Sequence, residues 1–247
     1  MNNARRIARE IADRITESLK PYRSPERAER EQQYLKSDLT FLGATLPDIR
    51  RVTKSACGRA KLDRATATAL AEQLWRKPIF EYRMAAVIVL ERHAAVLAPE
   101  DLPLTERLIR DSRTWALVDG LAANVVGDLV GRHGLRREMD RWARDPDFWV
   151  RRSSLLAEMK PLKQGASFEP FAARADALLD EKEFFIRKAI GWVLRETSKT
   201  RPDEVYEWIA PRTDRASGVT MRETVKYLDA ERAERLMQAY RERRPTR

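Results

Sequence analysis

Residues 114–131, TWALVDGLAANVVGDLVG, carry apolar side chains with the spacing of an amphipathic α-helix. The apolar arc of this predicted helix contains Val118, Leu121, Ala122, Val125 and Leu129. Trp115 falls on the edge of the arc and Asp119 lies one step further toward solvent, so an indole and a carboxylate share one face. This pair has two interpretations: a packing tryptophan beside a solvated charge, or two residues that act together.

Most of the chain repeats the helical pattern, and strand-like alternation is scarce. The pattern predicts about fourteen helices, and pairs of them recur every ~35–40 residues, as in helical repeat proteins. We therefore predict an all-α fold, a superhelix (solenoid) of HEAT-like α–α repeats, with a compact helical bundle as the competing architecture. No low-complexity linker divides the chain, so we predict a single domain over residues 1–247.

The composition is strongly basic: 48 Lys and Arg residues stand against 38 Asp and Glu residues, which gives a formal charge of +10. Such a protein often binds a polyanion, and nucleic acid is the specific expectation. The alternative is an arginine-rich protein without that role. A single cysteine excludes an intrachain disulfide, and no apolar signal peptide or run of ~20 apolar residues occurs. We expect a cytoplasmic protein without a membrane partner.

Residues with metal-binding or nucleophilic chemistry are few. His93 and His133 lie in different predicted helices, without another His or a Cys at metal-ligand spacing. Cys57 has no motif around it and is interpreted as a small buried residue. Glycine-rich phosphate loops and nucleophile elbows are also missing from the sequence. We expect no metal and no cofactor.

A second unusual segment begins with Asp145-Pro146-Asp147, which predicts a helix start. Trp149 falls on the edge of the apolar arc of the helix that follows, and Arg152 falls inside the arc. Since burying an unpaired guanidinium is costly, Arg152 must be paired or must line a groove. An internal ion pair that joins two repeats is the alternative interpretation.

A third segment, residues 183–196 (EFFIRKAIGWVLRE), has its apolar arc at Ile186, Ile190 and Val193. Trp192 lies well away from this arc. Its neighbours on the helical wheel are the basic side chains Lys188, Arg195 and Lys199. An aromatic ring within a cationic stripe is typical of a nucleic-acid surface, where charge contacts phosphates and the ring contacts a sugar or base. Alternatively, Trp192 packs under the aliphatic stems of its neighbours.

Residues 183–203, EFFIRKAIGWVLRETSKTRPD, closely resemble the C-terminal part of the DNA alkylation repair glycosylases that are built from HEAT-like repeats. The similarity extends, in the same order, to Tyr34-Leu35-Lys36 with Phe41-Leu42-Gly43 and Pro47, to Trp115 with Asp119, and to Asp147-Phe148-Trp149 with Arg152. The resemblance implies a C-shaped solenoid that holds duplex DNA in a basic concave groove. It also implies removal of cationic N3- and N7-alkylated purines without a metal.

By this resemblance, Asp119 corresponds to the catalytic carboxylate, and Trp115 and Trp192 correspond to the indoles that flank the sugar of the lesion. Arg152 corresponds to an arginine that contacts the DNA backbone. One departure is visible at Thr114, where the family often has a second tryptophan. Because some relatives bind DNA without activity, the presence of the individual site residues matters.

The resemblance therefore implies a monofunctional alkylpurine DNA glycosylase of base excision repair, which acts as a monomer on duplex DNA containing alkylated purines. Its catalytic residues would be Asp119, Trp115 and Trp192, and its DNA-binding residues would be Arg152, Trp149, Lys188, Arg195 and Lys199. Two alternatives remain. The first is a non-catalytic HEAT-repeat protein that binds damaged or branched DNA, and the second is a HEAT adaptor that binds other proteins.

Overall fold

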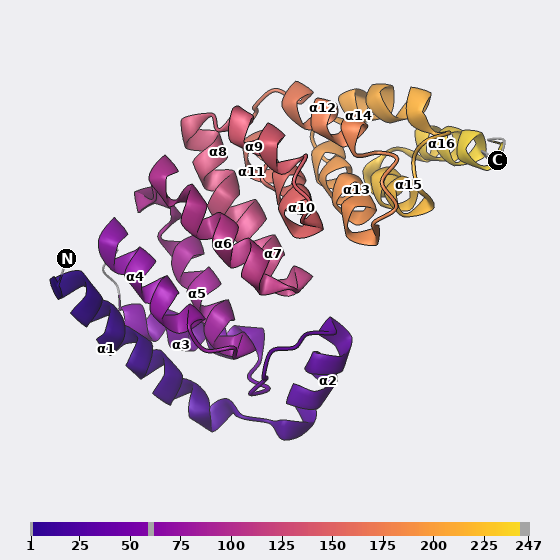
Figure 1. Ribbon diagram of the computed structural model, residues 1–247. Helices are drawn as coiled ribbons and strands as arrows, with labels where there is room; N and C mark the ends of the chain where they lie inside the picture. Colours follow the sequence, from indigo (N-terminus) through magenta and orange to yellow (C-terminus); the bar gives the residue numbers. More distant parts are fainter. Residues whose placement is uncertain (1, 59–61, 243–247) are drawn as a thin grey trace. The chain divides into compact units, whose positions relative to one another are not determined.

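The computed structural model describes residues 2–58 and 62–242, and helices make up most of this part of the chain (Figure 1). The described residues form two compact units, divided between Leu129 and Val130. The division falls inside helix α8 (Gly127–His133). Apart from an isolated bridge between Thr40 and Ile79, these residues contain no β structure.

The first unit contains helices α1 to α7 and a short π-helical segment. The α-helices are α1 (Asn2–Leu19), α2 (Pro25–Leu35), α3 (Leu46–Cys57), α4 (Arg64–Trp75), α5 (Phe80–Arg92), α6 (Leu102–Ser112) and α7 (Trp115–Gly120). The π-helical segment, η4 (Leu121–Val126), joins α7 to α8. Helix α1 packs on α3 and α4 and helix α4 packs on α5, so each helix buries its apolar side against its neighbours.

Helix α5 is almost entirely buried, whereas helix α2 lies on the surface. From Phe80 to Leu90 nearly every residue of α5 is buried, because other helices surround it. Helix α2 has no buried residue and ends at Lys36, which has a left-handed backbone conformation. The sequence alone places both segments in helices, but only packing reveals that α5 is the central helix of this unit and that α2 lies on the surface.

The turn after α2 is held by a buried carboxylate of α5. Glu81 has no exposed surface and accepts hydrogen bonds from the backbone N–H groups of Leu42 (2.9 Å) and Gly43 (2.7 Å). Gly43 has a φ of +84°, and a Cβ atom there would lie 2.1 Å from the carbonyl oxygen of Ser24. Burial raises the pKa of the Glu81 carboxyl, and the backbone N–H groups only partly oppose this. The turn therefore requires both a glycine and this carboxylate.

The second unit is built around α13. Its helices are α9 (Arg136–Trp142), α10 (Phe148–Leu156), α11 (Met159–Lys163), α12 (Glu169–Ala177), α13 (Phe184–Ser198), α14 (Pro202–Ile209), α15 (Gly218–Thr224) and α16 (Ala230–Glu242). Helix α13 packs on α10 on one side and on α15 on another. A buried arginine, Arg174 of α12, pairs with Glu158 and with Asp140 (2.7 Å) and so joins three segments of this unit.

The structure confirms the predicted all-α class and several predicted details. All five apolar-arc residues of the 114–131 segment have no exposed surface, as do Ile186, Ile190 and Val193 of α13. The helix predicted for 114–131 departs from a regular α-helix, because its middle is the π-helical segment η4. The basic concave groove and the single domain over 1–247, which includes residues outside the described ranges, stay predictions.

Candidate functional site

Trp115 and Asp119 lie four residues apart in α7 of the first unit. Both are partly exposed, although Leu117 and Val118 between them are fully buried. The Trp115 ring meets the Tyr34 ring of α2 in a T-shaped arrangement, with 6.0 Å between the ring centroids. Tyr34 itself is 73% exposed. An aromatic surface with a carboxylate one helical turn away therefore faces solvent in this unit.

Tyr34 is a candidate site residue that the sequence analysis did not select. Its helix, α2, has no buried residue, so no packing requirement explains an aromatic side chain there. The contact with Trp115 joins segments far apart in the chain, and helical periodicity within either segment does not reveal it. Two signals were available: the family resemblance at Tyr34-Leu35-Lys36, and the aromatic residue itself, which follows five polar residues, Glu29 to Gln33.

The backbone changes from α-helical to π-helical after Gly120, the residue that follows Asp119. Residues Leu121–Val126 form a π-helical turn, an arrangement found often at functional sites. Helix α5 fixes this turn in two ways. A Cβ atom on Gly120 would lie 2.7 Å from Cγ1 of Val87, so glycine allows α7 to approach α5 closely. The Asn124 amide also donates to Glu91 of α5 over 2.8 Å. The position of Asp119 is thus set by the packing of the next turn.

Thr114, the departure from the family pattern, stands at the N-terminus of α7. Its side chain is buried, with 1% of its surface exposed, and its hydroxyl has no hydrogen-bond partner among the described residues. A buried hydroxyl without a partner costs stability. The position therefore accommodates a small side chain beside Trp115, and the threonine hydroxyl contributes no capping hydrogen bond.

Arg152 of α10, in the second unit, is buried, with 2% of its surface exposed. Its Nη1 atom donates to the backbone carbonyl of Phe185 over 2.5 Å, and its guanidinium lies 5.8 Å from the centre of the Phe185 ring. The arginine was expected to be paired or to line a groove, and in the structure it joins α10 to the first turn of α13. Contact between Arg152 and DNA stays a prediction.

Trp149, predicted on the DNA-binding surface, lies in an aromatic cluster. Its ring packs against Phe148 (4.5 Å between centroids) and against Phe185 (4.7 Å), and 8% of its surface is exposed. This burial favours a packing role over a DNA contact. The helical wheel placed Trp149 at the edge of the apolar arc, but it did not include the rings that α13 supplies.

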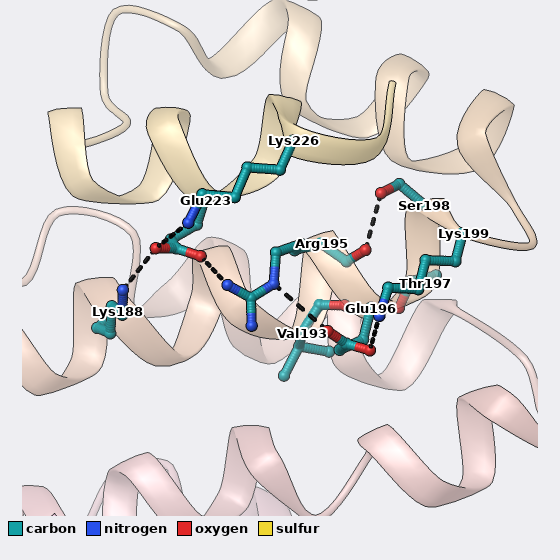
Figure 2. Close-up of polar contacts among 9 residues, drawn as sticks. All are labelled: Lys188, Val193, Arg195, Glu196, Thr197, Ser198, Lys199, Glu223 and Lys226. Atoms are coloured by element: carbon teal, nitrogen blue, oxygen red, sulfur yellow. Dashed lines mark hydrogen bonds and ion pairs between the residues drawn. The ribbon is translucent and has the colours of Figure 1, made fainter. Parts of the chain in front are cut away.

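Trp192 of α13 has a different environment. It is partly exposed, and among the described residues no ring or cation lies against it at a stacking distance. The three basic residues predicted around it belong to one polar network (Figure 2). Lys188 and Arg195 both pair with Glu223 of α15, and Lys199 pairs with Glu196 over 2.6 Å. The predicted basic stripe is thus a set of ion pairs.

Glu223, which the sequence analysis did not select, is the centre of this network. Its carboxylate pairs with Lys188 (2.5 Å), Lys226 (2.9 Å) and Arg195, while its side chain is 7% exposed. Burial raises the pKa of Glu223, but hydrogen bonds from Lys188 and Lys226 and the charge of Arg195 outweigh burial and lower the pKa to about 2. Four cations against two carboxylates leave the network with an excess of positive charge.

Comparison with known protein families identifies the chain. The model of a family described as "DNA alkylation repair enzyme" matches residues 15–228. The chain belongs to the DNA alkylation repair enzyme family. No curated protein sequence matches it significantly. The matched residues include Tyr34, Trp115, Asp119 and the whole of α13, so the family relationship covers the residues described above in both units.

Solved structures support the helical-repeat fold of this DNA alkylation repair enzyme. A structure described as a predicted DNA alkylation repair enzyme from Enterococcus faecalis is 24% identical, with a TM-score of 0.72 over 84% of this chain and 97% of the other. AlkD2 from Streptococcus mutans is 16% identical, with a TM-score of 0.57 over 82% of this chain and 100% of the other. The protein smu.31 from Streptococcus mutans UA159 is 15% identical, with a TM-score of 0.56 over 83% and 98% of the two chains.

Within residues 2–58 and 62–242, no group of three or more His, Cys, Asp and Glu side chains has an arrangement suited to a metal ion. In the same ranges, every helix is too short or too polar to cross a bilayer.

Proposed function

We propose that this DNA alkylation repair enzyme is a monofunctional DNA glycosylase that hydrolyses the N-glycosidic bond of cationic N3- and N7-alkylated purines in duplex DNA. It would act as a monomer in the cytoplasm on the bacterial nucleoid. The observation that carries the proposal is the partly exposed pair of Trp115 and Asp119, which flanks the buried residues Leu117 and Val118 of α7, with Tyr34 against the indole. A carboxylate and two aromatic rings offer anionic and π-electron surfaces to a cation.

The residue types suit the proposed reaction. Alkylation at N3 or N7 makes the purine cationic, so the base leaves as a neutral molecule and no general acid is required. Positive charge then develops on the deoxyribose near C1′. A carboxylate facing that carbon stabilises the charge and orients a water molecule, as preorganised electrostatics. Indole faces attract the same cation and contribute about 0.5–2 kcal/mol each. Asp119 and Trp115 have these roles in the proposal, and Tyr34 supports the indole.

The second unit supplies a surface for DNA in this proposal. Trp192 is available for contact with the sugar of the lesion, and the network of Lys188, Arg195 and Lys199 has positive charge in excess for the phosphates. Such a surface binds duplex DNA mainly through its backbone, so its affinity depends on salt more than on sequence.

The decisive experiment is incubation of the protein with duplex DNA that contains N7-methylguanine, followed by chromatography for the free base. Release of the base supports the glycosylase. Binding of the duplex without release contradicts it and favours the non-catalytic DNA-binding protein. If the protein does not bind duplex DNA even at low salt, both proposals are wrong and the protein-binding adaptor becomes the better account.

A further inference from the structure

The carboxylate of Glu223 joins cations from two elements of the second unit. Lys188 and Arg195 belong to α13, whereas Lys226 belongs to the short segment η6 (Val225–Tyr227), which follows α15. Figure 2 shows the three cations around the carboxylate, with Lys188 and Arg195 on different sides of it. Since 7% of the Glu223 side chain is exposed, water competes little for these ion pairs.

The close approach of α15 to α13 depends on Gly191. A Cβ atom on Gly191 would lie 2.7 Å from Cβ of Glu223 and 3.0 Å from the carbonyl oxygen of Thr220. The first distance is too short for a real Cβ atom, and the second is tighter than most, so a side chain at this position would require α15 to shift away from α13. A glycine directly before Trp192 therefore allows Glu223 to reach both Lys188 and Arg195.

The three α13 residues around this contact share one helical face. Lys188, Trp192 and Arg195 occupy positions i, i+4 and i+7, so the two cations lie on either side of the indole along the helix. We infer that Glu223 is a positioning residue, which holds Lys188 and Arg195 in place on both sides of Trp192 so that the indole and the cations meet a damaged nucleotide together. This inference rests on the proposed glycosylase function.

Positioning can be distinguished from a purely electrostatic role, because the two predict different results when the charge is removed. Glu223 is an anion within a surface that binds a polyanion. Removing its charge alone strengthens the attraction of the surface for DNA. Releasing Lys188 and Arg195 from their fixed positions slows base release, since small displacements at a reacting centre are costly. Positioning thus predicts a slower maximal rate without weaker binding.

Glu196 offers a matched control on the same helix. It pairs with Arg195 (3.3 Å) and Lys199 (2.6 Å), and its side chain is 33% exposed, so both of its ion pairs in the described part of the chain lie within α13 or directly after it. The variants Glu223→Gln and Glu196→Gln raise the net charge equally. The experiment measures single-turnover release of N7-methylguanine against protein concentration for both variants and the wild type, below the melting temperature of each protein. Glu223→Asp, which keeps the charge but shortens the side chain, is the second variant.

We expect Glu223→Gln to release base about tenfold more slowly at saturation, with equal or tighter binding, and Glu223→Asp to be slowed as well. Glu196→Gln is expected to bind more tightly and to be slowed less than Glu223→Gln, because Arg195 and Lys188 both keep their pairs with Glu223. If Glu223→Gln and Glu196→Gln have the same rate, or if Glu223→Asp matches the wild type, the positioning role is wrong. If the wild-type protein releases no base, the proposed glycosylase function is wrong instead. In that case positioning still predicts a smaller gain in DNA affinity for Glu223→Gln than for Glu196→Gln, and equal gains would overturn it.

Discussion

The regions around Trp115 in the first unit and Trp192 in the second differ in the exposure of their carboxylates. Near Trp115 the surface carboxylate, Asp119, is partly exposed, and the indole has an aromatic neighbour in Tyr34. Near Trp192 the central carboxylate, Glu223, is buried, while the lysines that pair with it are 39% and 49% exposed. The first region places a partly exposed carboxylate beside aromatic rings, and the second places exposed lysines around a buried carboxylate.

This difference suits two tasks in one reaction. An exposed carboxylate beside aromatic rings can stabilise a cationic sugar. Exposed cations with a buried counter-charge can contact phosphates while staying ordered. We therefore propose that the first region contributes mainly to the rate of base release, and that the second contributes both to binding and, through Trp192 and the cations beside it, to the rate.

The largest effect is expected where two tryptophans that look alike in the sequence differ in the structure. Trp149→Ala removes a ring that is packed between Phe148 and Phe185, and it should lower the free energy of unfolding by about 3–5 kcal/mol. Trp192→Ala removes a partly exposed ring and should cost less stability, while base release and DNA affinity both fall. Urea unfolding and binding assays measure the two properties. Equal stability losses would contradict the assignment of Trp149 to the core.

A pH-dependent difference is expected between two buried carboxylates, Glu223 and Glu81. The pKa of Glu223 falls from 4.5 to about 2, so its ionised form stabilises the folded state above pH 4.5, and this contribution is lost as the pH falls toward 2. Because one pKa unit corresponds to about 1.36 kcal/mol, protonation of Glu223 should lower the free energy of unfolding by about 3 kcal/mol at most, and added salt makes this loss smaller. The stability difference between wild type and Glu223→Gln should therefore shrink on acidification.

Glu81 should behave in the opposite way. Its pKa is raised, so its contribution is fully present below 4.5 and is lost as the pH rises through the raised value. The difference in the free energy of unfolding between wild type and Glu81→Gln should grow as the pH falls from 7 to 4. Urea unfolding at pH 7, 5, 4 and 3 measures both differences. Two trends of the same sign would mean that cations do not govern the titration of Glu223.

A smaller effect is expected from the exposed lysines of the second region. Replacing Lys199 and Lys226 with glutamine should weaken DNA binding severalfold at low salt. Each lost phosphate contact should reduce the slope of log affinity against log salt by about 0.9. Replacing Lys20 and Lys54, exposed lysines of the first unit, removes the same charge and serves as the control. An equal change of slope in both double variants would argue against a specific binding surface on α13 and η6.

The smallest effect is expected at Thr114. Valine has the shape of threonine but no hydroxyl, and the Thr114 hydroxyl has no hydrogen-bond partner among the described residues. Thr114→Val should therefore leave the melting temperature unchanged or raise it slightly. Base release should also stay unchanged, because the indole of Trp115 keeps its contact with the Tyr34 ring. A clear drop in melting temperature would show that the hydroxyl has a partner that this structure does not describe.

Helical periodicity was sufficient to predict α13 and its buried residues Ile186, Ile190 and Val193, because the positions within one helix depend on local geometry alone. It could not predict that Lys188 and Arg195 meet Glu223, which lies in another helix. Gly191 is visible in the sequence, but the need for a glycine there depends on the close approach of α15, which the sequence does not reveal. The charged network was therefore predicted as a stripe and found as ion pairs.

The region around Asp119 shows the same limit. The apolar arc of residues 114–131 was predicted correctly, and the position of Asp119 at its margin followed from it. The π-helical turn after Asp119 was not predicted, because it depends on how Gly120 and Asn124 fit against α5. The Tyr34 contact likewise requires two distant segments to meet. Sequence periodicity therefore finds candidate residues, and tertiary packing decides their environment.

The measurement that tests the account most directly compares Asp119→Asn with the wild type in single-turnover release of N7-methylguanine from duplex DNA. Asparagine keeps the shape of the side chain and removes the charge. If the carboxylate stabilises a sugar cation, release at saturating protein should slow by about 100-fold, equivalent to ~2.7 kcal/mol of transition-state stabilisation. DNA affinity should stay the same or rise. Release at the wild-type rate by a folded Asp119→Asn protein would contradict the catalytic role of Asp119.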